Sequence, residues 1–468
     1  MLSAKKIIRL IPIICLMGFV QTVNAQINSP FSRYGLGNEI YISQNATSQA
    51  MGGFTAAYTT SMNGSFGQSI NFNNPASFGS IYMTTFDLGV NFTNTKLKQE
   101  STNQQEKSNY LTPNYLVIGV PLSKEKKMGM AFGLRPLTQV NYSLNELKLV
   151  SSTGDTLYNN YVGSGGLNQV FLGVGKSWKN ISVGLTTGVN FGRKNIQNIK
   201  SLDYNPDSTY LYQTMASTNT IYSGVFLNLG MLGETTLKSK TKAKTTDKTE
   251  YSLSYGATAT LDQSMSAKQD RLRTTGLFTS TTESPIDTAS YEKEVPGKVK
   301  IPALITAGIA LHKKEISNRG TYDQWVIGIQ LDHAAWRNKY QSYNSDAIEN
   351  GITDKLSNAW MMRLGVQFCP NPYDFENYFS TVTYRAGYYT GKDYINFDNK
   401  GLTISAFTIG MGLPIRKYRS YDYQYTVINL ALQMGQRGSS VNDFKESFIQ
   451  FTLGYSLSDV WFNKRKYD

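Results

Sequence analysis

The sequence predicts an all-β protein: a closed antiparallel transmembrane β-barrel of about 14 strands with an N-terminal plug inside its lumen. Two observations carry this expectation. Apolar residues alternate with small or polar residues through most of the chain after residue 80, which is the period of a strand with two different faces. The connections between these segments alternate between short and long, as they do in bacterial outer-membrane barrels.

The alternation is clearest in the last such segment, residues 448–462. One register is apolar or aromatic, the other is small or polar, and an aromatic pair ends the segment. A transmembrane strand needs about 9–11 residues, with aromatic side chains at the membrane surface. We therefore expect a closing strand and assembly signal here, in which charge at Leu453 disturbs insertion more than charge at Thr452. The residues of this prediction are Phe451, Leu453, Tyr455, Leu457, Trp461 and Phe462.

Earlier segments repeat the pattern. Residues 82–92, 181–191, 325–332 and 428–434 alternate in the same way. Polar side chains at every second position are costly against lipid, so they are expected to face a wet or hydrogen-bonded interior. Counting all such segments gives about 14, an even number as bacterial barrels require. The predicted barrel domain is 81–468.

The connections add independent information. Those at Leu122–Lys126 and Lys179–Asn180 are short, whereas Asn141–Gly166 and Asn195–Ser217 are long. Short connections are expected on the periplasmic side and long ones outside. The Lys- and Thr-rich stretch Gly233–Lys248 breaks this rule because it is long on the periplasmic side. Either a strand is miscounted there, or a solvated hairpin projects inward.

The N-terminus has the features of a cleaved signal peptide, predicted to be residues 1–25. Lys5, Lys6 and Arg9 precede an apolar run, and Val23-Asn24-Ala25 is a small-residue cleavage pattern. The alternative, a retained membrane anchor, needs about 20 apolar residues, and this run is shorter.

Composition limits the possible chemistry. There are only 2 cysteines, and after cleavage Cys369 alone remains, so we expect neither a disulfide nor a thiolate metal site. No cofactor or metal is predicted. The net charge of +13 suits contact with anionic outer-membrane lipid and lipopolysaccharide. Because the chain has no basic stripe interleaved with aromatic residues, nucleic acid is not an expected partner.

Residues 26–80 differ from the rest of the chain. They are rich in Gly, Ser and Asn and do not alternate. A disordered leader is one interpretation, but such segments contain few aromatic residues, and this one includes Phe31, Phe54 and Phe72. We therefore expect a compact plug, or hatch, that folds inside the barrel.

The plug segment also resembles a known family. The turn Asn74-Pro75-Ala76-Ser77, directly before the first strand, is similar to the NPA turn of the long-chain fatty-acid outer-membrane transporters (FadL/TodX-like). The opening Ser29–Gly35 and Met51-Gly52-Gly53 resemble the Bacteroidetes-type branch of that family. The resemblance implies a fourteen-stranded barrel with an N-terminal hatch. It also implies passive uptake of hydrophobic molecules, with sideways release near a kinked third strand.

The third predicted strand contains the candidate ligand pathway. Pro136 cannot donate to a β-ladder, so it is expected to mark a bulge or a gap, unless it lies just past the paired part of the strand. Arg135 is expected to point inward, where it could bind a ligand carboxylate or form a structural pair with Asp87 or Asp332. Phe54 and Phe72 of the plug complete the predicted pathway.

No enzyme is predicted. His312 and His333 are the only histidines: His312 is expected to be a turn residue, and His333 lies beside Asp332 at the outer end of a strand. Two functions remain open. One is an outer-membrane channel for hydrophobic small molecules, and the other is a structural or secretion-associated barrel that acts as a scaffold or partner subunit. Either protein would be inserted by the barrel-assembly machinery.

Overall fold

The structure is a computed structural model. It describes residues 29–39, 45–59, 68–149, 156–203, 212–241, 247–278, 283–318, 320–341, 356–374, 376–397, 400–415, 425–438 and 444–459. The predicted signal peptide and the aromatic pair Trp461 and Phe462 lie outside these residues. Within them, no helix has the length and apolar character needed to cross a bilayer.

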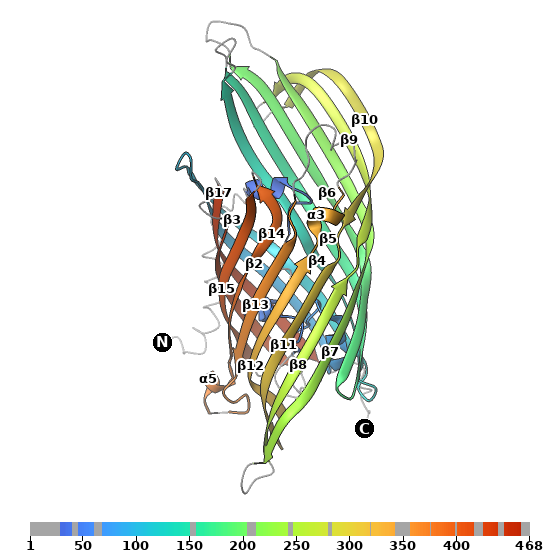
Figure 1. Ribbon diagram of the computed structural model, residues 1–468, viewed down its shortest axis with the longest axis vertical. Coiled ribbons are helices and arrows are strands. Elements are labelled where there is room, and N and C mark those ends of the chain that lie inside the picture. Colours follow the sequence, from blue (N-terminus) through green and yellow to red (C-terminus); the bar gives the residue numbers. More distant parts are fainter. Residues whose placement is uncertain are drawn as a thin grey trace, which may run out of the picture.

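Strands make up most of the described chain (Figure 1). The first half contains β1(Asn38–Glu39), β2(Thr84–Gln99), β3(Gln105–Ser123), β4(Met128–Leu149), β5(Thr156–Trp178), β6(Ile181–Asp203), β7(Gln213–Thr241), β8(Lys248–Thr260) and β9(Gln263–Phe278). The second half contains β10(Glu283–Ile301), β11(Leu304–Ser317), β12(Gly320–Ala334), β13(Ala359–Phe368), β14(Thr383–Phe397), β15(Lys400–Ile415), β16(Tyr425–Arg437) and β17(Phe444–Asp459). The short helices are η1(Pro30–Arg33), α2(Ala46–Gln49), η2(Pro75–Ser80), α3(Trp336–Lys339) and α5(Tyr378–Thr381).

Fourteen of these strands close into a barrel. Strands β2–β8 and β11–β17 pair with their neighbours in antiparallel order, β8 pairs with β11, and β17 pairs with β2. The closing ladder is continuous from Phe444 opposite Gln99 to Asp459 opposite Thr84. The predicted fold class and strand number are therefore confirmed.

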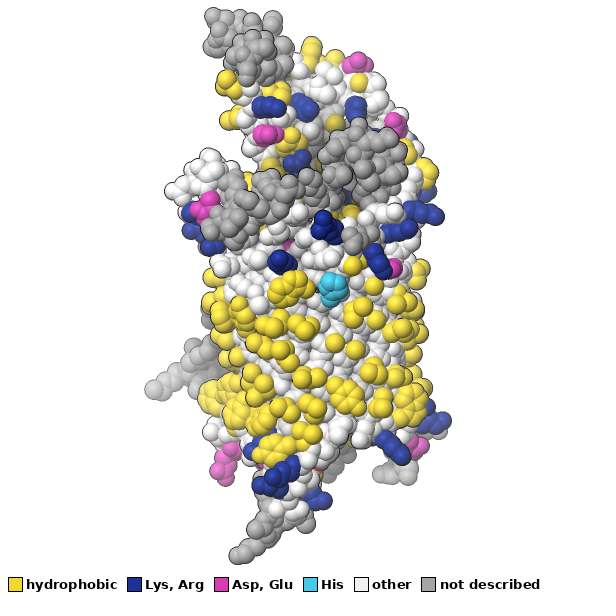
Figure 2. Space-filling view, viewed as in Figure 1, with side chains coloured by type: hydrophobic (Ala, Val, Ile, Leu, Met, Phe, Trp, Pro, Cys, Tyr) yellow, Lys and Arg dark blue, Asp and Glu magenta, His cyan; other side chains and the backbone are white. Residues whose placement is uncertain are grey.

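The two faces of the closing strand follow the predicted register. Ile449, Phe451 and Leu453 are 49%, 40% and 39% exposed, whereas Thr452 and Ser456 are fully buried. Figure 2 shows the apolar side chains as a belt across the face in view, with Lys and Arg above and below it. Such a belt is the lipid-facing surface of a transmembrane barrel.

The strands rise to different heights at the end with the longer hairpins, which is the extracellular end in bacterial barrels. Strands β4–β7 extend far above the others, and the hairpin β9–β10 joins them by pairing with the upper part of β7 (Figure 1). We call this six-stranded extension the tall wall. The sequence predicted long loops after Asn141 and Asn195. This was wrong, because these residues lie in strands whose pairing continues to Leu149 and Asp203.

At the opposite, periplasmic end, the Lys- and Thr-rich stretch proves to be a projecting hairpin. Strand β7 continues to Thr241, and its last residues, from Glu234 onward, pair with β8. No extra strand is needed in the count, because the described part of this stretch extends the β7–β8 ladder beyond Ile181, where β6 ends.

One ladder of the barrel is incomplete. Strand β3 pairs with β4 only from Leu116 opposite Leu134 down to the turn, while β4 continues along β5 to Leu149. Both strands carry a register shift at this level: β3 against β2 next to Tyr115, and β4 against β5 between Pro136 and Thr138. A bulge bends its strand and disrupts the local ladder, which explains why the two strands separate here.

Candidate functional site

Two groups of N-terminal residues fill the lumen at different heights. Residues 45–59 and 68–80, which we call the plug, are almost entirely buried. Residues 29–39, which we call the strap, lie along the upper part of β4. The strap pairs through Asn38 opposite Gln139, and the backbone N–H of Ser29 donates to the carbonyl of Asn141 at 3.1 Å. The strap therefore occupies part of the β4 edge that β3 leaves unpaired.

The far side of the strap is also fixed to the wall. Arg437 of β16 donates to Asn38 at 2.8 Å, Ser29 donates to Glu446 of β17 at 2.9 Å, and Tyr394 of β14 donates to the Gly37 carbonyl. Lys194 of β6 reaches the Gly35 carbonyl at 2.7 Å. Because these partners come from opposite walls, the strap crosses the lumen.

The plug is seated on two cross-strand rows of glycine. Gly175, Gly184 and Gly230 lie opposite one another on β5, β6 and β7, and a Cβ on any of them would come within 3.0 Å of Asn74 or Pro75. A second row on β12, β13 and β14 seats residues 51–54 in the same way; it consists of Gly328, Gly365 and Gly387. The missing side chains let the plug backbone approach the wall.

The predicted turn before the first strand sits on the first of these rows. The Asn74 side chain caps η2 by accepting from the Ala76 N–H at 3.1 Å, and it donates to the Ala56 carbonyl at 2.6 Å. Ser77 donates to the Asn71 carbonyl at 2.9 Å. The turn therefore ties the two halves of the plug together as well as meeting the barrel wall.

A chamber of about 220 Å³ lies between the strap and the plug. Its polar side includes Asn73 of the plug, Arg135 and Arg363. Its apolar side includes Leu36 of the strap and Trp336 of α3, and Trp336 stacks on Tyr394 with a centroid separation of 4.4 Å. Asp332 also lines the chamber and pairs with Arg363. A chamber with one apolar and one polar side suits an amphipathic molecule.

A small ion-pair junction holds α3 against the barrel. Asp262, between β8 and β9, accepts from the Ala303 N–H at 2.5 Å and from the Lys339 ammonium of α3 at 3.2 Å. These two donors lower the pKa of the Asp262 carboxyl below its usual value. The junction fixes the helix that carries Trp336.

Arg135 points into the lumen, as the register of its strand predicted. Its guanidinium donates to Gln169 at 2.7 Å and to Asn73 at 2.5 Å, and it lies 5.2 Å from the ring of Phe72. The two acids considered as structural partners are engaged elsewhere. Asp332 binds Arg363 at 2.6 Å, and Asp87 accepts from the Ile70 N–H and the Ser69 hydroxyl, both at 2.9 Å.

The other predicted pathway residues do not all meet at the chamber. Pro136 lies at the bulge in β4, next to the end of the β3–β4 ladder. Phe72 lies beneath Arg135 in a buried cluster with Phe171. Phe54 lies apart from them, fully buried over Gly328 on the second glycine row. Sequence reasoning placed Phe54 on the ligand pathway because it is an aromatic residue of the plug. In the structure it packs on the second glycine row and is not among the residues that line the chamber.

Sequence reasoning missed Arg363, the second cation of the chamber. Its side chain is only 4% exposed, and it joins Asp332 of the neighbouring strand to the Gly52 carbonyl of the plug at 3.2 Å. The sequence did contain a signal, because Arg363 lies in the inward register of its strand. Burying a charged side chain there costs free energy unless it is paired. The partner could not be found without the cross-strand register.

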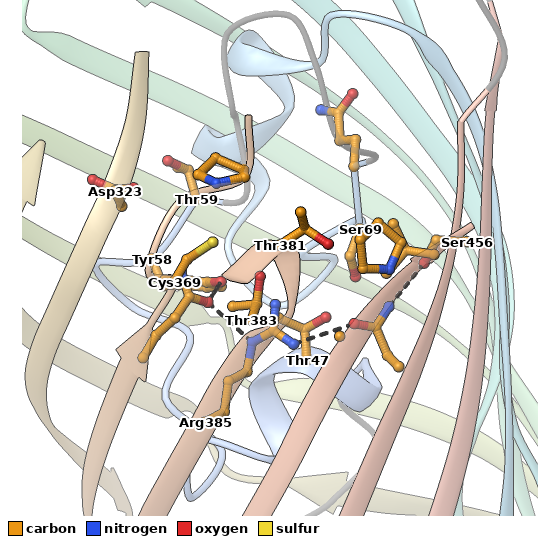
Figure 3. Close-up of a pocket in the computed structure, with 17 residues that line it drawn as sticks. Thr47, Tyr58, Thr59, Ser69, Asp323, Cys369, Thr381, Thr383, Arg385 and Ser456 are labelled. Atoms are coloured by element: carbon orange, nitrogen blue, oxygen red, sulfur yellow. Dashed lines mark hydrogen bonds between the residues drawn. The ribbon is translucent and has the colours of Figure 1, made fainter. Parts of the chain in front are cut away.

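The periplasmic face of the plug contains a polar pocket of about 40 Å³, which Figure 3 shows from the side. Arg385 of β14 donates to Gln367 at 3.0 Å and to Asn429 at 3.3 Å. Tyr58 of the plug donates to the same Gln367 oxygen at 2.7 Å. The network fastens the underside of the plug to the wall.

His312 corrects another expectation. It lies within β11 rather than in a turn, its Nε2 is 2.5 Å from the Ser254 hydroxyl, and its Nδ1 is 3.2 Å from Asp323. The arrangement matches an Asp–His–Ser triad in residue types. However, Ser254 and His312 are each only 4% exposed, so a substrate carbonyl has no room to approach the hydroxyl. The described residues contain no group of three His, Cys, Asp or Glu side chains that could hold a metal ion.

A family model named BamG matches residues 4–468. The chain belongs to the BamG family. No curated protein matches it. Among solved structures, this BamG-family chain is similar to the toluene transporter TbuX of Ralstonia pickettii, with a TM-score of 0.50 and 13% identity over 89% of this chain and 98% of TbuX. A FadL homologue from Pseudomonas aeruginosa gives a TM-score of 0.52 and 10% identity over 89% and 98%. These likenesses show the fold, and they confirm the FadL/TodX-like architecture that the sequence predicted.

Proposed function

We propose that this protein is an outer-membrane channel for passive uptake of hydrophobic small molecules, with release sideways through the wall between β3 and β4. One observation carries the proposal: the β3–β4 ladder, in which both strands continue upward without pairing to each other, lies beside the chamber. Arg135 faces the chamber from the residue directly above the last β3–β4 pair. A ligand in the chamber would therefore be next to the place where the fewest backbone bonds must break.

The outer surface at the same level supports this route. A groove of about 590 Å³ crosses the lipid-facing side of β3–β7, and its lining includes Leu116, Phe132 and Leu134. Leu116 and Leu134 are the last paired residues of the incomplete ladder. An apolar groove is a suitable landing site for a hydrophobe that leaves the wall. The printed names of the structural neighbours, a toluene transporter and a FadL homologue, agree with such a ligand class.

The decisive variant is Pro136→Val. It restores a backbone donor and strand propensity at the bulge, so it should help β3 and β4 pair further and seal the exit. Uptake of a long-chain fatty acid should fall, and uptake of a small hydrophilic sugar should stay low in both forms. Pro414→Val is the matched control, since Pro414 lies in the fully paired β15–β16 ladder. Both proteins are expressed at matched levels in a strain that lacks its own hydrophobe channel.

The outcomes separate the parts of the proposal. If the wild-type protein gives no uptake above the empty strain across fatty acids and monoaromatic hydrocarbons, it is not a transporter. If the wild-type protein and Pro136→Val transport equally well, the channel proposal still stands, but the proposed exit between β3 and β4 is ruled out.

A second function is favoured by the family. The name BamG points to the barrel-assembly machinery, and the tall wall offers a surface that a plugged channel does not need. We propose as the alternative that the protein is a partner subunit for assembly of other outer-membrane barrels. Depletion would then lower the folded, heat-modifiable fraction of other barrels, and Pro136→Val would restore it as well as wild type does. An unchanged fraction after depletion would eliminate this function.

A further inference from the structure

Lysines gather on the outer face of β17, β2 and β3 near the extracellular end of these strands. Cross-strand register places Lys96 of β2 opposite Lys107 of β3, and Lys98 of β2 opposite Lys445 of β17. Lys445 is eight residues from Leu453 in an unbroken ladder, so it points to the same lipid-facing side. Opposite residues of a ladder share a face, so all these lysines point outward. We call Lys96, Lys98, Lys107 and Lys445 the lysine cluster.

The pairing of like charges sets the lysine cluster apart from the rest of the barrel. Like charges directly opposite one another destabilise an antiparallel ladder. In every other pair of the described ladders, a charged residue faces an uncharged residue or one of opposite sign. Arg437 opposite Glu446 is an example. Two like-charge pairs in adjacent ladders indicate that an anion offsets the repulsion.

This chain provides only part of that negative charge. Every residue of the β2–β3 hairpin is described, and within it Glu100 binds Lys98 at 2.8 Å. Glu106 and Glu446 both lie opposite Leu97, on the other face of the sheet, and Glu446 accepts from the strap. Among the described residues, no carboxylate lies within ion-pair distance of the other three lysines of the cluster.

The lysine cluster lies directly above the lipid-facing belt. The row of outward residues below Lys96 holds Asn94 and Asn109, whose side chains hydrogen bond at 2.5 Å. The row below that is apolar and consists of Phe451, Phe92 and Leu111, of which Phe451 is 40% and Leu111 58% exposed. Because each residue rises about 3.3 Å, Lys96 is about 13 Å along its strand from the apolar row. The order from apolar to amide to cationic side chains matches that from acyl chains to headgroups in a leaflet.

We propose that the lysine cluster binds the phosphate groups of lipopolysaccharide, with an acyl chain of the same lipid against the apolar row below. The cluster is at the extracellular end, so the lipid beside it belongs to the outer leaflet. Each lysine ammonium has three donors and binds phosphate as a point charge. An acidic protein segment could also neutralise lysines, but it would not explain why the cluster borders the lipid-facing belt.

The proposal gives a defined place to the lipopolysaccharide contact that the net charge of the chain suggested. It depends on the orientation of the barrel in the outer membrane and not on uptake, so it stands or falls separately from the channel proposal.

Binding of purified lipid A, the phosphorylated anchor of lipopolysaccharide, to the full-length mature protein in detergent tests the site. Lys96→Gln/Lys107→Gln removes one like-charge pair and leaves the apolar row unchanged. Lys238→Gln/Lys240→Gln is the matched control, because it removes the same charge from two exposed lysines at the periplasmic end. In native mass spectrometry titrations, the first variant should bind lipid A at least about tenfold more weakly than wild type, since each lysine contributes to the attraction of an anionic lipid. The control should bind as wild type does.

Both variants should remain heat-modifiable on a gel, because neither substitution removes a backbone hydrogen bond. Two further lipids are titrated against the wild-type protein, so that the test does not depend on the variants alone. Dephosphorylated lipid A should bind at least about tenfold more weakly than lipid A, because the lysines then have no anion to bind. Phosphatidylglycerol, which offers a single phosphate, should also bind more weakly than lipid A.

Three results would overturn the proposal. Equal lipid A affinity of wild type and Lys96→Gln/Lys107→Gln would mean that the cluster serves another anion, such as an acidic protein segment. Equal binding of lipid A with and without phosphate would show that the acyl chains alone bind. Equal binding of phosphatidylglycerol and lipid A would rule out lipopolysaccharide as the specific ligand.

Discussion

The membrane-spanning cylinder and the tall wall above it are built from the same strands but stabilised differently. In the cylinder, inward side chains such as Thr452 and Asp87 are fully buried against the plug. In the tall wall, Leu147 and Leu149 remain 70% exposed, and the described residues place no strand beside two edges of the sheet for much of their length. The comparison shows that the plug buries the inward side chains of the cylinder, whereas strand pairing alone leaves these leucines of the tall wall exposed.

The strongest test of the filled cylinder is Arg363→Ala. The substitution leaves the Asp332 carboxylate buried without its ion-pair partner and releases the Gly52 carbonyl of the plug. Losing one member of a buried pair costs about 3–5 kcal/mol. The unfolding midpoint in urea, measured in lipid vesicles, should fall accordingly. A change below about 1 kcal/mol, the size typical of an exposed pair, would show that this contact does not hold the plug.

A charge on the lipid belt should have the next largest effect. Leu453→Arg places a guanidinium on the outer face of the closing strand and should cost about 2–4 kcal/mol at mid-membrane. Insertion is measured by the heat-modifiable fraction on a gel. The sequence predicts that Thr452→Arg is milder, because the residue faces the lumen. In the structure Thr452 is fully buried and its hydroxyl lies 2.6 Å from the Gln49 side chain of the plug. We now expect both variants to insert poorly, for different reasons.

The glycine rows permit a smaller and more local test. Gly184→Val would push a side chain into the Pro75 carbonyl, and overpacking of this kind costs about 1–3 kcal/mol. The displaced plug should also raise uptake of a small hydrophilic sugar. Gly401→Val is the control, because the nearest atom to its Cβ is the Ser357 hydroxyl at 3.9 Å. Equal sugar uptake by both variants would mean that the turn at Asn74–Ser77 is not what closes the lumen.

Substitutions of outward side chains in the tall wall should reduce the stability of the protein less than substitutions in the cylinder. Leu147→Ser changes a side chain that is already 70% exposed, so the stability of the purified protein should change by less than about 0.5 kcal/mol. The same urea titration used for Arg363→Ala measures it. A loss comparable to that of Leu453→Arg would mean that Leu147 packs against part of this chain, and the distinction between the two regions would disappear.

The sequence by itself determined the faces and the number of the strands. In a strand, successive side chains point to opposite sides because of backbone geometry alone, so the alternation of Ile449, Phe451 and Leu453 could be assigned without knowing any neighbour. The even strand count follows from the same local period. The inward direction of Arg135 and the irregularity at Pro136 were also local properties of one strand.

Only the tertiary structure decided what each inward residue meets. The glycine rows, the Asp332–Arg363 pair and the group around His312 each join residues from different strands, and cross-strand register is not encoded in the period of any single strand. The strap is a further case, because its partners Lys194 and Tyr394 lie on β6 and β14, on opposite sides of the barrel. Phe54 shows the same limit: its apolar character predicted burial, but its contact depends on Gly328, which lies more than two hundred residues along the chain.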